Sequence, residues 1–367
     1  MARQHDLTDV VLDGRYRIVA PLSEGAMGAV YRAQRVGLGR DVAIKMMRTA
    51  LPGSLAARER FERESKLMAK LVHPNTVSVI DFGVHEERPY LVMELVDGVS
   101  LHDLIAREGK LAVRRAANIA CQLLAGIAHA HEQDIIHRDI KPANIMVSTK
   151  EAIGDHVQVL DFGLARLLES SSLLTDGFTV GTPSYMAPEQ CRGAAIDARV
   201  DLYACGAVLF EMIAGHKPFV AEDGLEVVKM QIHEPPPALA SVLGSDPGPI
   251  ERVIARALAK DPADRYPSAV AMADAIAVAV PNARAASQPV IPTIGSSALV
   301  PIHDAPVPPP SSAVRLDPAE ASALRRTLPG SRMKWAVLFI ALLVAGSIYG
   351  IVRARDYLSE QARSPSR

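Results

Sequence analysis

A proline-rich segment near the C-terminal end limits what this chain can fold into. Between Pro281 and Ser331 ten prolines fall among alanine, serine and valine, and Pro308, Pro309 and Pro310 are consecutive. Proline fixes φ and lacks a backbone N–H, so we expect an extended linker over residues 281–334. Before it, strand-like runs alternate with runs of helical period. With 49% hydrophobic residues, that part can bury a sizeable core.

An uncharged apolar run follows the linker. Trp335 to Val352 comprises eighteen residues without a charged side chain. As a helix it is about 27 Å long, close to the roughly 30 Å hydrocarbon thickness of a bilayer. We therefore expect residues 335–352 to form one transmembrane helix; the alternative is a helix of a soluble protein that packs on a partner.

The N-terminal residues indicate the orientation of that span. Met1 to Gly14 is polar and acidic and lacks the apolar stretch of a secretory signal. We therefore expect the folded part on the cytoplasmic side of the cell (inner) membrane. Residues 353–367 would then form a short extracytoplasmic tail.

Charge and cysteine content exclude several functional classes. Lysine and arginine total 40 and aspartate and glutamate 41, a net charge of −1, so no general basic field attracts nucleic acid. The three cysteines, Cys121, Cys191 and Cys205, are widely spaced and form no C-x-x-C pair. Neither a disulfide framework nor a cysteine zinc site is expected.

A glycine turn precedes a lysine on an apolar strand. The stretch Leu22-Ser-Glu-Gly-Ala-Met-Gly-Ala-Val-Tyr31 places Gly25 and Gly28 between two strand-like runs, where backbone amides are able to approach phosphates. Ser23 replaces the first glycine of the usual G-x-G-x-x-G. By itself such a turn is more often part of a purely structural hairpin. The next strand ends in Val42-Ala-Ile-Lys45, and a buried lysine requires a partner.

Glu64 is a candidate partner for Lys45. Between residues 55 and 71, Phe61, Glu64, Met68 and Leu71 recur at steps of three and four residues, which predicts a helix with one apolar face. A carboxylate on that face favours a positive partner. The alternative is a solvated glutamate at the edge of the face.

Three further motifs follow in a fixed order. They are His137-Arg-Asp139-Ile-Lys141-Pro-Ala-Asn144, then Asp161-Phe-Gly163, then Ala187-Pro-Glu189. With the glycine turn and Val-Ala-Ile-Lys45, this series resembles the protein kinase family over residues 16–280. The stretch Gly181-Thr-Pro-Ser-Tyr-Met-Ala-Pro-Glu-Gln190 is similar to bacterial, eukaryotic-like serine/threonine kinases, many of which combine a kinase domain, a linker and a membrane span.

The resemblance implies an α+β, two-lobed protein kinase fold. We expect a β-rich N-lobe over residues 16–95 and a helical C-lobe over 99–280, preceded by an N-terminal extension, residues 1–15. It also implies transfer of the ATP γ-phosphate to serine or threonine hydroxyls of proteins, in signal transduction. Asn144 and Asp161 would hold Mg²⁺, or alternatively Mn²⁺, because their oxygens are hard ligands.

Roles of individual residues follow from the same resemblance. Asp139 would accept the proton of the substrate hydroxyl, with Lys141 near the γ-phosphate. Lys45 would hold the α- and β-phosphates, and Glu64 would steady Lys45. The residues expected around the nucleotide are Leu22, Ser23, Gly25, Gly28, Val30, Ala43, Lys45, Glu94, Val96 and Met146, with Met93 behind the adenine.

Regulation is expected in the segment before Gly181. Thr175 and Thr179 are the candidate phosphorylation sites, on their position relative to Gly181-Thr182; the alternative is a plain polar loop. Copies tethered to one membrane would phosphorylate each other, since a surface raises their effective concentration. The main alternative to an enzyme is a pseudokinase scaffold at the membrane that binds nucleotide without transferring phosphate.

Overall fold

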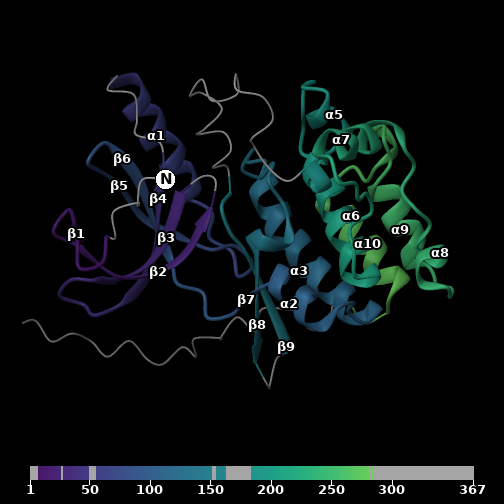
Figure 1. Ribbon diagram of the computed structural model, residues 1–367, viewed down its shortest axis with the longest axis horizontal. Coiled ribbons are helices and arrows are strands. Elements are labelled where there is room, and N and C mark those ends of the chain that lie inside the picture. Colours follow the sequence, from purple (N-terminus) through teal and green to yellow (C-terminus); the bar gives the residue numbers. More distant parts are fainter. Residues whose placement is uncertain are drawn as a thin grey trace, which may run out of the picture. The chain divides into compact units, whose positions relative to one another are not determined.

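The structure is a computed structural model that describes residues 7–25, 28–48, 55–150, 154–162, 183–281 and 283. The chain divides into two compact units, Met1–Pro292 and Thr293–Arg367, and the described residues all belong to the first. Within this unit a β-rich N-lobe precedes a mainly helical C-lobe along the chain (Figure 1).

The N-lobe is a six-stranded antiparallel sheet with one helix. The strands follow the order β1-β2-β3-β4-β6-β5. Alternation of side chains on β4 separates two apolar clusters, one containing Ile44 and Met46 and the other Ala43 and Met47. The elements are β1 (Val11–Leu12), β2 (Tyr16–Gly25), β3 (Gly28–Arg35), β4 (Asp41–Met47), α1 (Leu55–Met68), β5 (Val79–His85) and β6 (Arg88–Glu94).

Helix α1 packs against one of these clusters. Phe61 and Met68 of α1 are buried in it beside Ala43 and Met47, and the Phe61 ring meets Phe82 of β5 edge to face. The helix ends at Met68, before the predicted residue 71, and a turn follows. Lys45 lies two residues from both Ala43 and Met47 on β4 and therefore shares their face of the sheet. Its side chain thus leaves the sheet on the side covered by α1.

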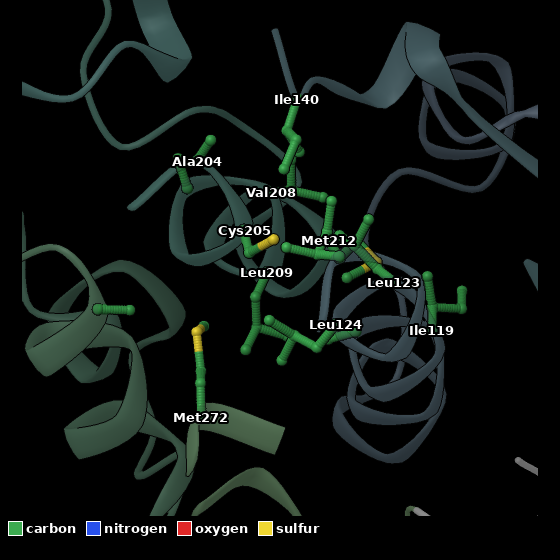
Figure 2. Packing of buried hydrophobic residues seen from close by; sticks show 14 of the residues in the cluster. Ile119, Leu123, Leu124, Ile140, Ala204, Cys205, Val208, Leu209, Met212 and Met272 are labelled. Carbon is green, nitrogen blue, oxygen red and sulfur yellow. The ribbon is translucent and has the colours of Figure 1, made fainter. Parts of the chain in front are cut away.

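The C-lobe is built around two long helices. It contains β7 (Val99–Ser100), α2 (Leu101–Glu108), α3 (Val113–His131), β8 (Ile145–Lys150), β9 (Gly154–Val159), α5 (Pro188–Cys191), α6 (Arg199–Ala214), α7 (Gly224–His233), α8 (Leu239–Leu243), α9 (Ile250–Ala257) and α10 (Ala269–Ala279). Helix α6 is apolar almost all round and is buried along nearly its whole length, as expected for a central helix. Figure 2 shows its side chains interleaved with those of α3, with Met272 of α10 alongside.

A short segment after α1 anchors the N-lobe to the C-lobe. Thr76 forms a bridge with Val159 at the end of β9. The buried Asn75 donates through Nδ2 to the carbonyl of Val157 at 2.7 Å and to Oε1 of Gln122 at 3.3 Å. A buried side chain that satisfies backbone groups of another element fixes the relative position of both.

The folded region extends beyond the boundaries expected at Tyr16 and Val280. Strand β1 pairs with β2, and Leu7 and Leu12 are buried in the N-lobe core. At the other end Ala283 is buried in the C-lobe core. Local apolar periodicity does not reveal these short attachments, because each is too short to show a period of its own.

The predicted membrane span lies outside the described residues. Within the ranges given above, no helix combines the length and apolar character needed to cross a bilayer. The predicted linker, except for Pro281 and Ala283, and the tail 353–367 also lie outside them.

Candidate active site

Lys45 and Asp161 join two segments that lie 116 positions apart. The Nζ of Lys45, on β4, is 2.6 Å from Oδ2 of Asp161, which follows β9. Only 9% of the Lys45 side chain and 16% of the Asp161 side chain are exposed. When an ammonium and a carboxylate are this buried, the attraction between them offsets the cost of removing each charge from water. The pair therefore brings a cation of the N-lobe and an anion of the C-lobe to one point.

Glu64 lies on the buried face of α1. It is 8% exposed, and its carboxylate is 3.8 Å from the guanidinium of Arg63. The pairing of Glu64 with Lys45 stays a prediction.

Asp139, Lys141 and Asn144 form a compact polar group. Lys141 Nζ donates to both carboxylate oxygens of Asp139, at 3.0 and 2.7 Å. Asn144 Nδ2 donates to the Asp139 carbonyl at 2.8 Å and to Oδ2 at 3.1 Å. The Asp139 side chain is 21% exposed, so the carboxylate is oriented by its neighbours and still open to solvent. A carboxylate in that state is able to accept a proton from a bound hydroxyl.

A buried carboxylate of α6 holds the loop that carries Asp139. Asp201, 1% exposed, accepts the backbone N–H groups of His137 and Arg138, each at 2.9 Å. It also lies 2.8 Å from Nε2 of His131 at the end of α3. The peptide groups just before Asp139 are thus fixed to the central helix of the C-lobe.

His137 connects that loop to the segment bearing Asp161. Its Nδ1 faces the backbone N–H of Asp139 at 3.3 Å, so Nδ1 accepts and Nε2 carries the proton that is donated to the carbonyl of Leu160 at 2.8 Å. The ring is fully buried and packs against Phe162, with centroids 4.8 Å apart. Leu160 also donates its N–H to the carbonyl of Asn144 at 2.9 Å. Both backbone groups of Leu160, its N–H and its carbonyl, therefore form hydrogen bonds with the loop.

Gly28 has a structural requirement that Gly25 does not share. The two residues face each other across the β2–β3 hairpin. Gly28 has φ of 154°, and a Cβ there would lie 2.0 Å from the carbonyl oxygen of Met46, which no side chain tolerates. At Gly25 the nearest atom to a Cβ would be 4.0 Å away. Residues 26–27, the tip of the turn, lie outside the described residues.

Apolar side chains surround the space next to Lys45. Val30, opposite Lys45 on β3, and Val96, after β6, are partly buried against the cluster that contains Ala43 and Met93. Met146 on β8 pairs with Ser100 of β7, which places it beside the connection from Glu94 to the C-lobe. Leu22 and Ser23 lie on exposed β2, with Ser23 opposite Val30.

The sequence matches a known family over most of its folded part. Residues 16–275 match the model described as the protein kinase domain. The chain belongs to the protein kinase family. Members of this family use ATP and a divalent metal ion.

Curated relatives show that this kinase is of the bacterial serine/threonine type. The chain is 39% identical over 309 residues to serine/threonine-protein kinase pkn3 of Myxococcus xanthus, covering 82% of this chain and 56% of that protein. It is 38% identical over 270 residues to PknB of Mycobacterium tuberculosis, covering 71% and 42% respectively. The chain thus spans about half the length of these relatives or less.

A solved kinase structure has a similar fold. The PknI kinase domain of Mycobacterium tuberculosis aligns with a TM-score of 0.58 at 29% sequence identity, covering 74% of this chain and 98% of that one. Both lobes described above therefore match an experimentally observed kinase architecture.

Two buried ion-bearing contacts support the C-lobe of this kinase. Asp201 anchors the loop that carries Asp139, as described. Arg265, 2% exposed, binds both carboxylate oxygens of Glu189 at 2.7 Å. Its remaining N–H groups donate to the carbonyls of Ala259, Arg199 and Lys260, so all five guanidinium donors are used. A buried charge is tolerated only with such complete pairing.

Leu160 was not singled out from the sequence, and Phe162 was quoted only as part of the Asp161-Phe-Gly163 motif. Leu160 packs against the same apolar cluster as Val30 and Val96. Phe162 packs on His137. Their positions immediately before and after Asp161 were the available signal.

Several predicted positions of the kinase are not described by the structure. Gly163, Thr175, Thr179 and Thr182 lie outside the described residues. Their predicted roles therefore stay predictions. Burial raises the pKa of the Cys205 thiol well above its usual value and that of Cys191 to about 11, which disfavours the reactive thiolate form.

Proposed function

We propose that this chain is an active serine/threonine protein kinase that transfers the γ-phosphate of ATP to hydroxyls of proteins. The observation that carries the proposal is the meeting of Lys45, from the N-lobe, with Asp161, whose neighbours Leu160 and Phe162 contact the loop bearing Asp139. Phosphoryl transfer needs little covalent help but requires positioning and neutralisation of charge. This arrangement gathers groups for both purposes.

The residues would divide the reaction among them. Asp139 would accept the proton as the hydroxyl oxygen bonds to the γ-phosphorus and the bond to the bridging oxygen of ADP breaks. Lys141, which already donates to Asp139, would offset negative charge on the transferred phosphate. Lys45 would do the same for the other phosphates, and Val30, Ala43, Leu160 and Met146 would enclose the adenine.

Asp161 and Asn144 fit a divalent cation. The Asn144 amide nitrogen is committed to Asp139, which directs its carbonyl oxygen away as an available acceptor. One carboxylate and one amide oxygen, completed by phosphate oxygens and water, is a donor set suited to Mg²⁺. When bound, the ion supplies positive charge against the phosphates, and Mn²⁺ is the alternative.

Label transfer from γ-labelled ATP to a generic basic protein tests this function. Asp161→Asn should reduce incorporation to background, whereas the control Asp264→Asn, at an exposed aspartate of the C-lobe, should retain it. Hydrolysis of the labelled product should yield phosphoserine or phosphothreonine. Equal, background incorporation by wild type and Asp161→Asn would support the scaffold instead.

We also propose that the kinase domain is cytoplasmic and anchored in the cell membrane by residues 335–352, with residues 281–334 as linker and 353–367 as tail. The support is the uncharged eighteen-residue run after a proline-rich segment. The full chain should stay with membranes after carbonate extraction, and deletion of residues 335–352 should release it. Recovery of the full chain in the soluble fraction without detergent would contradict the anchor.

Copies sharing a membrane would phosphorylate each other in the segment that contains Thr175 and Thr179. The support is the position of these hydroxyls shortly before Gly181-Thr182. Mass spectrometry of the purified protein should find phosphate there, and Asp161→Asn should lose it unless mixed with wild type. Phosphate on neither threonine of the active enzyme would contradict both candidates.

A further inference from the structure

Gln190 links α5 to the loop that carries Asp139, called the catalytic loop from here on (residues 137–144), through one side-chain amide. Its Nε2 donates to the backbone carbonyl of Arg138 at 3.1 Å. Its Oε1 accepts the backbone N–H of Ala187 at 3.0 Å, at the start of α5. The donor half of the side chain thus serves the loop, and the acceptor half serves the helix.

The carbonyl that Gln190 holds belongs to the peptide group directly before Asp139. Arg138 has φ of 67°, a left-handed conformation unusual for a residue with a side chain. Its N–H is fixed by Asp201 at 2.9 Å. The N–H on the other side of the same peptide group, that of Asp139, faces Nδ1 of His137 at 3.3 Å. Gln190 therefore supplies the contact that holds the carbonyl side of this peptide.

Helix α5 is itself firmly placed. Glu189 is bound by Arg265 through two bonds of 2.7 Å in the interior of the C-lobe. The preceding residues Pro183–Tyr185 are connected to α7, because Gln231 donates to the carbonyl of Pro183 at 3.1 Å. A displacement of α5 would thus pull on the peptide next to Asp139 through Gln190.

We propose that Gln190 is a positioning residue for phosphoryl transfer: it orients the Arg138–Asp139 peptide, and so the Asp139 carboxylate, relative to α5. This inference rests on the proposed function, in which Asp139 accepts the hydroxyl proton. The two contacts require one donor and one acceptor on the same side chain, and the Gln190 amide offers both.

Two substitutions of the full chain separate the halves of this side chain. Gln190→Glu keeps the acceptor for Ala187 and removes the donor to Arg138. Gln190→Met keeps the approximate shape and removes both. Gln34→Glu is the matched control, since Gln34 Nε2 also donates to a backbone carbonyl, that of Gly39 at 3.2 Å, on the exposed N-lobe surface.

The measurements are kcat, the KM for ATP and the unfolding temperature. Both Gln190 variants should lose between about tenfold and a hundredfold in kcat, as expected for a misplaced catalytic group. The KM for ATP and the unfolding temperature should stay near wild type, because the substitutions leave Lys45, Asp161 and the residues proposed to enclose the adenine unchanged. Gln34→Glu should match wild type in all three.

Three results would overturn the inference. The first is a wild-type kcat in Gln190→Glu. The second is a lowered kcat in Gln190→Glu together with a wild-type kcat in Gln190→Met. The third is a kcat that falls, in either variant, only in proportion to the fraction of protein that is folded. The second would assign the effect to the introduced charge. The outcome for Asp161→Asn keeps the two proposals apart. If Asp161→Asn abolishes transfer while Gln190→Glu does not change it, only the inference fails; if Asp161→Asn transfers normally, the proposed function fails.

Discussion

The catalytic loop and the β2–β3 hairpin, the two regions assigned here to phosphate chemistry, are held in opposite ways. The loop is fixed by buried polar groups, with Asp201 at 1% and His137 at 0% exposure. The hairpin is largely exposed beyond Pro21, with Leu22 at 49%, and depends on strand pairing and on Arg48, which donates to the carbonyl of Gly25 at 3.0 Å. Groups that meet a reacting atom need to be preorganised, whereas a segment that covers a bound ligand needs to move to admit it.

The largest effect is expected when the anchor of the loop is removed. Asp201→Ala would leave two buried backbone N–H groups and His131 without their acceptor, at about 1–3 kcal/mol for each unsatisfied group. For these three groups the expected loss of unfolding free energy is about 3–9 kcal/mol, measured by denaturant titration. The hairpin comparison is Glu24→Ala, which removes an exposed ion pair with Arg48 and should cost below about 1 kcal/mol. Similar losses for both variants would remove the contrast between the regions.

The hairpin should contain one rigid point. Gly28→Ala would drive a Cβ into the carbonyl of Met46 and should cost about 2 kcal/mol or more. Gly25→Ala has open space and should cost less than about 1 kcal/mol. Thermal unfolding of both variants, with nucleotide affinity as a second readout, makes the comparison. If Gly28→Ala were more stable than Gly25→Ala, a Cβ at residue 28 would not collide with the carbonyl of Met46, and the expectation would be wrong.

A smaller effect is expected with pH where the two lobes join. Burial and the neighbouring His129, whose ring stacks on His73 at 5.2 Å, lower the pKa of His73, although Glu132 acts in the opposite direction. Because the folded-state pKa lies below the unfolded value of 6.5, the contribution of His73 is fully present above pH 6.5 and is lost as the pH falls through the folded-state value. After solvent screening the loss should be below about 1 kcal/mol.

His129→Phe sharpens this test. The variant keeps a flat ring against His73 and removes the second imidazole. Stability measured by denaturant from pH 8 to 5 should fall less steeply than in wild type, and imidazole NMR should show a higher pKa for His73. Identical slopes and an unchanged His73 pKa would contradict the assignment.

The sequence indicated the candidate residues of the site more readily than the contacts that hold them in place. Lys45, Asp139, Asn144 and Asp161 were recognisable because each is a polar residue in a short motif beside apolar strands. Their mutual placement was predictable only through the family resemblance, since the motifs lie far apart in the chain. Gln190 was part of a quoted motif, but nothing local indicates that its amide reaches Arg138.

Strand β1 was not predicted, for a related physical reason. Strand β1 is two residues long and is defined by pairing with β2, not by its own periodicity. The ion pair of Lys45 with Asp161 depends on how β4 and the end of β9 approach each other. Such contacts between distant segments are properties of packing, which a single sequence does not encode in any one window.

The central claim is that Asp139 serves the transfer of phosphate and not the binding of nucleotide. Single-turnover phosphoryl transfer, measured beside the affinity for a non-hydrolysable ATP analogue with Mg²⁺, tests it in Asp139→Asn. We expect a rate lowered by about 10²- to 10⁴-fold with analogue affinity close to wild type. Transfer at the wild-type rate, or a loss of analogue binding in proportion to the loss of rate, would contradict it.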